Sequence, residues 1–197
     1  MQDETGALSA ERGGTMTPEQ ILDYCLSSLA GTVLVESWGE KGIFYNPGWM
    51  LKRGVYVLTV KEKDGDNDRA SHLNREDAFR VNLGVRKATF QKLFGKMPVR
   101  PAAGGVVDMD YDFTAFDTII PHPVYAWMGW ISVLNPSDKT FEQLKPLIQD
   151  AYEFSAEKFK KRKQAMQGSH SPALPLCRIR EPSLENHPIR LYLTINT

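Results

Sequence analysis

Apolar residues recur at the spacing of an α-helix near the start of the chain. They are Ile21, Leu22, Cys25, Leu26 and Leu29. At about 3.6 residues per turn, these positions form a single apolar stripe. The preceding Thr17-Pro18-Glu19-Gln20 supplies an N-cap, a proline at the first helical position and a glutamine three residues after the cap. The pattern predicts a helix that begins near Thr17, ends at Gly31 and packs on a sheet.

The next segments have the composition and alternation of β-strands. Residues 32–37, 42–46 and 55–62 are rich in β-branched and aromatic side chains, and glycine and proline separate them. They predict an antiparallel meander. In a further segment, Phe79, Val81 and Leu83 alternate with Arg80, Asn82 and Gly84. This period of two predicts a half-buried strand, and residues 125–134 are interpreted as the last core strand.

Two further helices are expected from apolar spacing. Residues 86–94 have helical periodicity and stop at Gly95, and residues 110–120 are interpreted as a short helix or turn. The longest helix is expected over residues 137–163, in spite of Pro146. Its apolar positions are Phe141, Leu144, Leu147, Ile148, Ala151, Phe154 and Phe159.

Both ends of the chain differ from this periodic middle. Residues 1–16 contain few large apolar side chains, which predicts a disordered tail. Residues 166–197 are rich in proline and are interpreted as an extension whose stretch 189–195 has the composition of an edge strand. The domain is therefore expected to span residues 17–165.

Composition is ordinary for one soluble domain, with 197 residues of which 42% are hydrophobic. The 24 basic and 24 acidic residues give zero net charge, which argues against nucleic acid or an anionic membrane as a partner. Apolar runs are too short for a spanning helix, and the acidic start lacks the features of a secretory signal, so we expect a cytoplasmic protein. Cys25 and Cys177 suggest neither a disulfide framework nor a zinc site.

Polar residues after the meander are the first candidates for a ligand site. Residues 64–68 alternate carboxylates as a calcium loop does, but Arg69 and Arg75 stand where such a loop needs glycine and glutamate. A solvated turn is favoured, with Asp68, Arg69 and Ser71 at the rim of a pocket.

The strand at residues 79–84 supplies the next candidates. Arg80 and Asn82 share one face, so both side chains are expected to point into a polar cleft. The alternative is a solvent-facing surface on which Arg80 is exposed or pairs with a carboxylate such as Asp68.

The block over residues 121–136 supplies aromatic candidates. His122 lies between two prolines, which restrict its backbone. No nucleophile or metal-ligand spacing accompanies it, so a structural histidine at a strand entrance is favoured over an acid/base group. Tyr125 is a further candidate. Trp127 and Trp130 have opposite parity on a regular strand, so only one of them is expected to line a pocket.

The end of the longest helix is basic. Lys158, Lys160, Lys161, Arg162 and Lys163 lie close together there. They are able to contact phosphates, but cations also complement the helix dipole at a C-terminus.

The order helix, three-strand meander, strand, helix, strand and long helix resembles the MmcQ/YjbR-like families over residues 17–163. Val35-Glu36-Ser37-Trp38-Gly39, Gly54-Val55-Tyr56-Val57-Leu58 and Ala151-Tyr152 carry this likeness. More closely, residues 61–65, 67–71, 79–80 and 122–136 resemble an uncharacterised branch of that group, the domain-of-unknown-function family 6194. The resemblance implies an α+β fold and no established activity.

These patterns predict an α+β domain with one antiparallel sheet of about five strands flanked by helices. The expected function is a non-catalytic binding module for a small molecule or protein, with no cofactor or metal. The expected ligand-binding residues are Asp68, Arg69, Ser71, Arg80, Asn82, His122, Tyr125 and Trp130. One alternative is an enzyme that uses His122 or Asp68 as acid/base and Arg80 as an anion anchor. Another is nucleic-acid binding through the basic helix end.

Overall fold

A six-stranded antiparallel sheet organises the molecule, in the order β1-β2-β3-β4-β6-β5. The computed structural model describes residues 14–37 and 39–168. The strands are β1 (Thr32–Ser37), β2 (Glu40–Tyr45), β3 (Val55–Lys61), β4 (Arg80–Gly84), β5 (Ile120–Pro121) and β6 (Trp130–Leu134). The predicted α+β class is confirmed. The additional strand is β5, a two-residue segment that pairs with β6.

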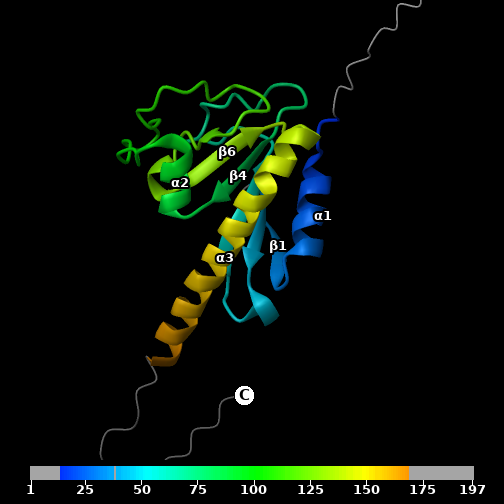
Figure 1. The fold of residues 1–197 in the computed structure, drawn as a ribbon, viewed down its shortest axis with the longest axis vertical. Coiled ribbons are helices and arrows are strands. Elements are labelled where there is room, and N and C mark those ends of the chain that lie inside the picture. The colour runs from blue at the N-terminus through cyan, green and yellow to red at the C-terminus, as the bar shows by residue number, and fades with distance from the viewer. Residues whose placement is uncertain (1–13, 38, 169–197) are drawn as a thin grey trace, which may run out of the picture.

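Helices cover one face of this sheet. The helix α1 (Pro18–Ser28) and the long helix α3 (Asp138–Gly168) lie side by side on it (Figure 1). Their contact includes an edge-to-face pair of the Tyr24 and Phe141 rings, with centroids 5.2 Å apart. The short helix α2 (Lys87–Phe94) follows β4, and its Phe90 joins the same core.

The core lies between the sheet and these helices. On β4 and β6, the residues that face the helices are Val81, Leu83, Ile131 and Val133. They pack in one cluster with Leu144 and Ile148 of α3. The predicted alternation along β4 is confirmed, since its apolar residues enter this core while its polar residues lie on the opposite face. The prediction of a half-buried strand is wrong, because every residue of β4 is buried.

Local sequence signals account for the ends of the first two helices. Thr17 and Gln20 form the predicted capping box at the start of α1. The helix α2 ends at Gly95, as predicted, with φ of 83°. The helix α3 contains Pro146 and runs to Gly168, five residues beyond the predicted Lys163.

The predicted strand over residues 125–134 is wrong in its first half. A 3-10 helix, η2 (Ala126–Met128), occupies that stretch, and β6 begins only at Trp130. Gly129, with φ of 86°, separates the two, because glycine adopts this left-handed conformation without strain.

The segment 110–119 forms turns, in agreement with the second of its two interpretations. A second 3-10 helix, η1 (Pro47–Trp49), follows β2.

Other predictions fall on residues that the structure does not describe. The predicted tail up to residue 13 and the extension from residue 169, with its edge strand, lie outside the described residues. Among residues 14–37 and 39–168, no helix is long and apolar enough to cross a bilayer.

Candidate functional site

The face of the sheet opposite α1 and α3 carries a pocket. The register places Thr59 of β3 beside Asn82 of β4, and Asn82 beside Ser132 of β6. Asn82 donates to the Thr59 hydroxyl at 3.0 Å and accepts from the Ser132 hydroxyl at 3.0 Å. The centre of this face is therefore a band of hydrogen-bonded polar side chains on three adjacent strands.

Aromatic residues lie beside this band because of an irregularity in β3. The register shifts so that Ile43 pairs with Leu58 while Phe44 pairs with Tyr56, which leaves Val57 as an extra residue. Val57 and Leu58 are consecutive, yet both are fully buried in the core. In a regular strand, Tyr56 would lie on the same face as Leu58, which is the core face. The bulge places Tyr56 on the pocket face instead.

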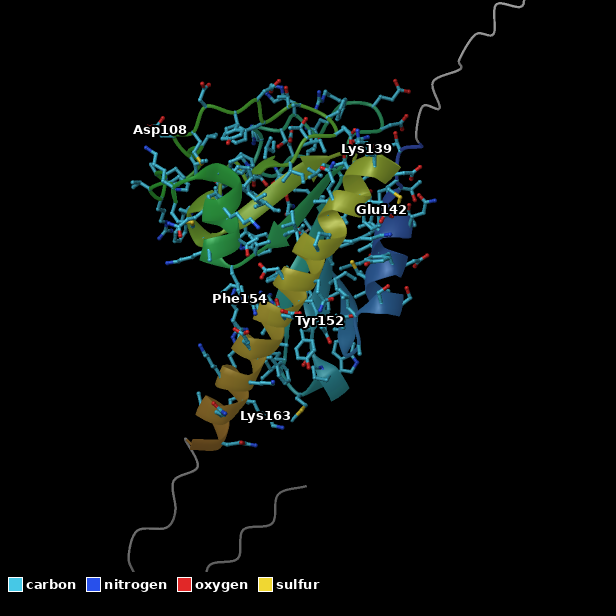
Figure 2. The ribbon with its side chains drawn as sticks, in the orientation of Figure 1. Asp108, Lys139, Glu142, Tyr152, Phe154 and Lys163 are labelled. Atoms are coloured by element: carbon cyan, nitrogen blue, oxygen red, sulfur yellow. The ribbon has the colours of Figure 1, made fainter. Side chains whose placement is uncertain are left out.

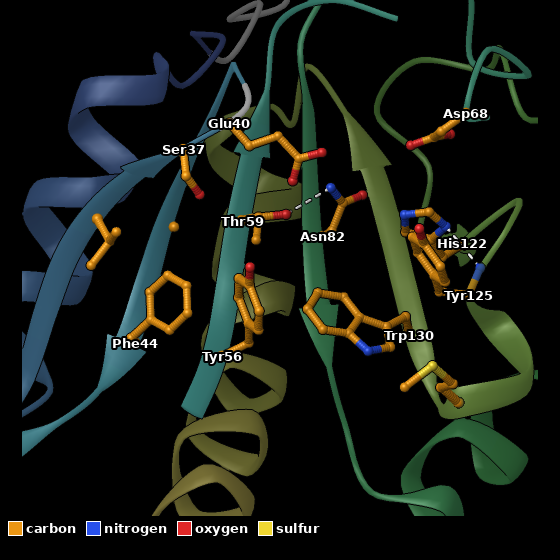
Figure 3. A pocket seen from close by; sticks show the side chains of 13 residues that line it. Ser37, Glu40, Phe44, Tyr56, Thr59, Asp68, Asn82, His122, Tyr125 and Trp130 are labelled. Atoms are coloured by element: carbon orange, nitrogen blue, oxygen red, sulfur yellow. Dashed lines mark hydrogen bonds between the residues drawn. The ribbon is translucent and has the colours of Figure 1, made fainter. Parts of the chain in front are cut away.

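The pocket has a volume of ≈ 330 Å³, within the range of small-molecule sites. Its walls come from β1 to β4, β6, η2, the loop between β3 and β4 and the loop before η2. Figure 3 shows aromatic rings at one end and carboxylates at the other. The lining residues are Val35, Ser37, Glu40, Gly42, Phe44, Tyr56, Thr59, Asp68, Asn82, His122, Tyr125, Met128 and Trp130.

Arg80 lies beneath the polar end and has no exposed surface. Its Nε donates to Asn82 Oδ1 at 2.8 Å, and its Nη1 donates to Ser71 Oγ at 2.7 Å. Both terminal nitrogens also donate to the Asp68 carboxylate. The remaining Nη2 hydrogen faces His122 Nε2, 3.3 Å from Nη2. The predicted pairing with Asp68 is thus confirmed, whereas a solvent-exposed Arg80 is excluded.

Asp68 stays ionised in this surrounding. Burial alone would raise the pKa of its carboxyl, but the hydrogen bonds and charge of Arg80 outweigh burial and lower the pKa to about 2. Lys61 Nζ lies 3.3 Å from Asp68 Oδ2 and 3.0 Å from Glu40 Oε1. Two carboxylates and two cations therefore alternate across the polar end of the pocket.

His122 is buried and held neutral. Its Nδ1 accepts hydrogen bonds from the amides of Val124 and Tyr125 at 3.0 and 3.1 Å. Burial lowers the pKa of the imidazole well below its ordinary value, and the nearby Arg80 charge lowers it further. Because Nδ1 accepts from these two amides, the single proton of the neutral imidazole is on Nε2.

The structure brings together most of the predicted site residues. Asp68, Ser71, Arg80, Asn82 and His122 share one hydrogen-bonded cluster. Of these five, Ser71 and Arg80 lie behind the pocket wall, and the other three line the pocket.

Four aromatic or charged residues considered from the sequence lie outside that cluster. Tyr125 and Trp130 line the pocket, whereas Trp127 does not. Arg69 points away, since its side chain is 69% exposed and pairs with Asp66 at 3.5 Å.

Sequence reasoning missed the lining residues on β1, β2 and β3. Ser37 and Val35 alternate along β1, so their shared face was visible in the sequence. Tyr56 was hidden by the bulge. The contribution of Glu40 depends on the pairing of β2 with β3, which is a tertiary property.

The basic residues lie near the C-terminal end of α3, where Figure 2 labels Lys163. There, the Lys158 ammonium lies 3.6 Å from the centre of the Phe154 ring, and Arg162 donates to the carbonyl of Gly54 at 3.1 Å. Two of the five basic residues of this helix end thus make contacts within the molecule.

Comparisons with known proteins give a family and a distant structural likeness. The model of a family of unknown function, DUF6194, matches residues 16–164. No curated protein matches the chain. A crystal structure of a protein from Pseudomonas syringae is similar, with 14% sequence identity and a TM-score of 0.39, over 71% of this chain and 99% of that chain.

Proposed function

We propose that this chain, which belongs to the DUF6194 family of unknown function, binds a small organic molecule in the pocket on the open face of its sheet. The observation that carries the proposal is the pocket itself, ≈ 330 Å³ in volume, with rings at one end and polar groups at the other. A concave site with an apolar body and a few oriented polar groups is the usual form of a small-molecule site.

The state of the lining side chains supports this proposal. Among the described residues, the hydroxyls of Ser37, Tyr56 and Tyr125 form no hydrogen bond with another side chain or with the backbone. Behind them, Arg80 is fully buried and hydrogen-bonded to Asp68, Ser71 and Asn82. Rigid support behind free polar groups is the arrangement that binding sites need, because it keeps the contact groups in place.

The same contacts make a non-catalytic role the better proposal. Arg80 has no exposed surface, and its N–H groups all face protein atoms, so it has no donor left to anchor an anionic substrate. His122 is held neutral with Nδ1 already occupied by two amides. Within the described residues, no serine or cysteine lies within hydrogen-bond distance of this histidine.

We further infer that the fold is of the MmcQ/YjbR-like kind. Its support is the order of elements, from α1 through the β1–β3 meander, β4, α2 and β6 to α3. A crystal structure of this chain, superposed on experimental structures of those families, tests the inference. A different strand order in the superposed sheets would refute it.

A thermal-shift screen of the full chain against metabolites and other small molecules tests the binding proposal. A ligand that binds only the native state raises the apparent melting temperature by mass action. We expect hits whose shift is lost in Tyr125→Ala, because Tyr125 lines the pocket and is 44% exposed.

Tyr111→Ala is the matched control. Tyr111 is 38% exposed and packs against Phe94, away from the pocket lining. Hits should survive this change. If no small molecule shifts the melt, or if both variants lose the shift equally, the proposed pocket function is wrong.

A further inference from the structure

We propose that the pocket selects an organic cation, in which an ammonium group is joined to an apolar body. This inference rests on the proposed small-molecule function and specifies its ligand class. We assign Glu40 as the counter-charge of the ammonium group, and the rings of Tyr56 and Trp130 as the apolar walls around the rest of the ligand.

The order of charges around the pocket carries the argument. The two charged residues that line it, Glu40 and Asp68, are both carboxylates. Their cationic partners, Lys61 and Arg80, are not part of the lining. A ligand in the pocket therefore contacts the two carboxylates and not their cationic partners, although the charges of the four side chains sum to zero. The lining itself therefore offers an anion two carboxylates and no cation, although the positive charge of Arg53 acts on the Tyr56 hydroxyl.

The cations behind the wall are paired with carboxylates and almost wholly buried. Lys61 is occupied by Glu40 and Asp68, and its side chain is only 10% exposed. The N–H groups of Arg80 face protein atoms on every side. The neutral His122 adds no positive charge to the lining, because burial first, and then Arg80, lowers its pKa.

Glu40 is the group best placed to accept an ammonium. Its Oε1 accepts from Lys61 at 3.0 Å, and its other carboxylate oxygen has no hydrogen bond with the described residues. Its side chain is 33% exposed. Figure 3 shows it extending from β2 across Thr59 toward Asn82. Charge-assisted hydrogen bonds to such an oxygen are stronger than neutral ones.

The opposite end of the pocket suits the rest of such a ligand. Phe44 and Tyr56 have ring centroids 4.1 Å apart, and the Tyr56 and Trp130 rings meet edge to face at 6.1 Å. Ring faces attract cations through their quadrupole, and they also bury apolar surface. A binding site with rings and a carboxylate thus favours an ammonium over an alcohol or carboxylate of similar shape.

Three probes that differ mainly in charge test the inference. They are 2-phenylethylamine, 2-phenylethanol and 3-phenylpropionate, and binding is followed by NMR titration of the full chain at neutral pH. We expect the amine to bind at least about 10-fold more tightly than the alcohol, and the carboxylate to bind most weakly.

Variants assign the preference to Glu40. In Glu40→Gln, the advantage of the amine over the alcohol should disappear while the affinity for the alcohol is retained. Glu36→Gln removes a carboxylate four residues away that is exposed and does not line the pocket, so it should keep the preference. Circular dichroism establishes that both variants are folded.

The outcomes separate this inference from the function on which it rests. If the alcohol or the carboxylate binds as tightly as the amine, or if Glu40→Gln keeps the preference, the cation assignment is wrong but the pocket remains a binding site. If none of the three binds while the broad screen yields only neutral or anionic ligands, the assignment is likewise overturned. If that screen yields no ligand, the proposed function fails as well.

Discussion

Arg80 shows how a charged side chain is accommodated in the interior of this protein. It has no exposed surface, and the Asp68 carboxylate, the Ser71 hydroxyl and the Asn82 amide accept its hydrogen bonds. Burying a charge is costly unless it is paired and hydrogen-bonded. These contacts therefore have a structural task, and they also position Asp68 and Asn82 at the pocket.

Removing the negative partner should destabilise the fold strongly. We expect Asp68→Asn to lower the free energy of unfolding by about 3–5 kcal/mol, because the guanidinium would stay buried without its counter-charge. Urea denaturation measures this change. Asp66→Asn alters a neighbouring carboxylate whose side chain is 99% exposed, and it should leave stability unchanged. Equal stabilities of the two variants would contradict this interpretation of Arg80.

Stability should also fall as the solution becomes acidic. The pKa of His122 is lowered below its ordinary 6.5 in the folded state by burial and by Arg80, so below pH 6.5 the unfolded chain binds a proton that the native protein does not. Asp68 acts in the same direction at lower pH, because Arg80 lowers its pKa from 3.8 to about 2 against the opposing effect of burial. Both stabilising contributions are thus fully present at neutral pH.

Urea denaturation across pH values between 6.5 and 3.8 tests the histidine contribution. We expect His122→Asn to be less stable at neutral pH but to lose less stability on acidification, since the buried group no longer titrates. His72→Asn replaces an exposed histidine and should keep the wild-type pH dependence. The same slope in all three proteins would show that burial of His122 is not responsible.

Among the elements, α2 depends on a neighbour for its N-terminus. Its N-cap residue, Arg86, makes no side-chain cap. Instead, Asp150 of α3 accepts the Arg86 amide at 3.0 Å, and its other carboxylate oxygen pairs with the guanidinium at 2.5 Å. A carboxylate from another helix therefore accepts from the N-cap amide, the donor that the N3 side chain satisfies in a capping box.

We expect Asp150→Ala to cost about 1–2 kcal/mol of stability, as the loss of a helix cap does. Amide hydrogen exchange should increase over residues 87–94, and chemical denaturation gives the energy. Glu153→Ala is the control, because Glu153 is 54% exposed and lies 3.8 Å from Arg86. If both variants cost the same, Asp150 does not cap α2.

The described residues share one main core, which joins distant parts of the chain. Its largest cluster joins α1, the central strands, α2 and α3, from Ile21 to Ala151. Neither end of the sheet has a separate large core, since the second cluster contains only Leu73, Ile120 and Leu134 as buried members. Unfolding should therefore be cooperative.

We expect tryptophan fluorescence and far-ultraviolet circular dichroism to give one coincident urea transition. The tryptophans report on tertiary packing, whereas circular dichroism reports on helices and strands. Two separated transitions would mean that part of the sheet unfolds independently of the shared core.

The accuracy of the sequence predictions depends on how local each determinant is. The capping box at Thr17 and the stop at Gly95 act within a few residues, and both are present as predicted. The prediction of a strand that begins at Tyr125 was wrong, because Trp127, an aromatic residue with high strand propensity, lies in η2 instead. At this position the strand propensity of the side chains has less influence on the backbone than the turn at Gly129, which has a left-handed conformation.

Periodicity and caps are properties of short segments, so the sequence alone was sufficient for the α+β class, most element positions and the shared face of Arg80 and Asn82. Only the tertiary structure decided that Arg80 is buried, that Arg69 points away and that Tyr56 and Glu40 line the pocket. Strand pairing, the β3 bulge and the packing of distant loops set these features. They bring residues such as Val35 and Trp130, which lie four strands apart in the sheet, into the lining of one pocket.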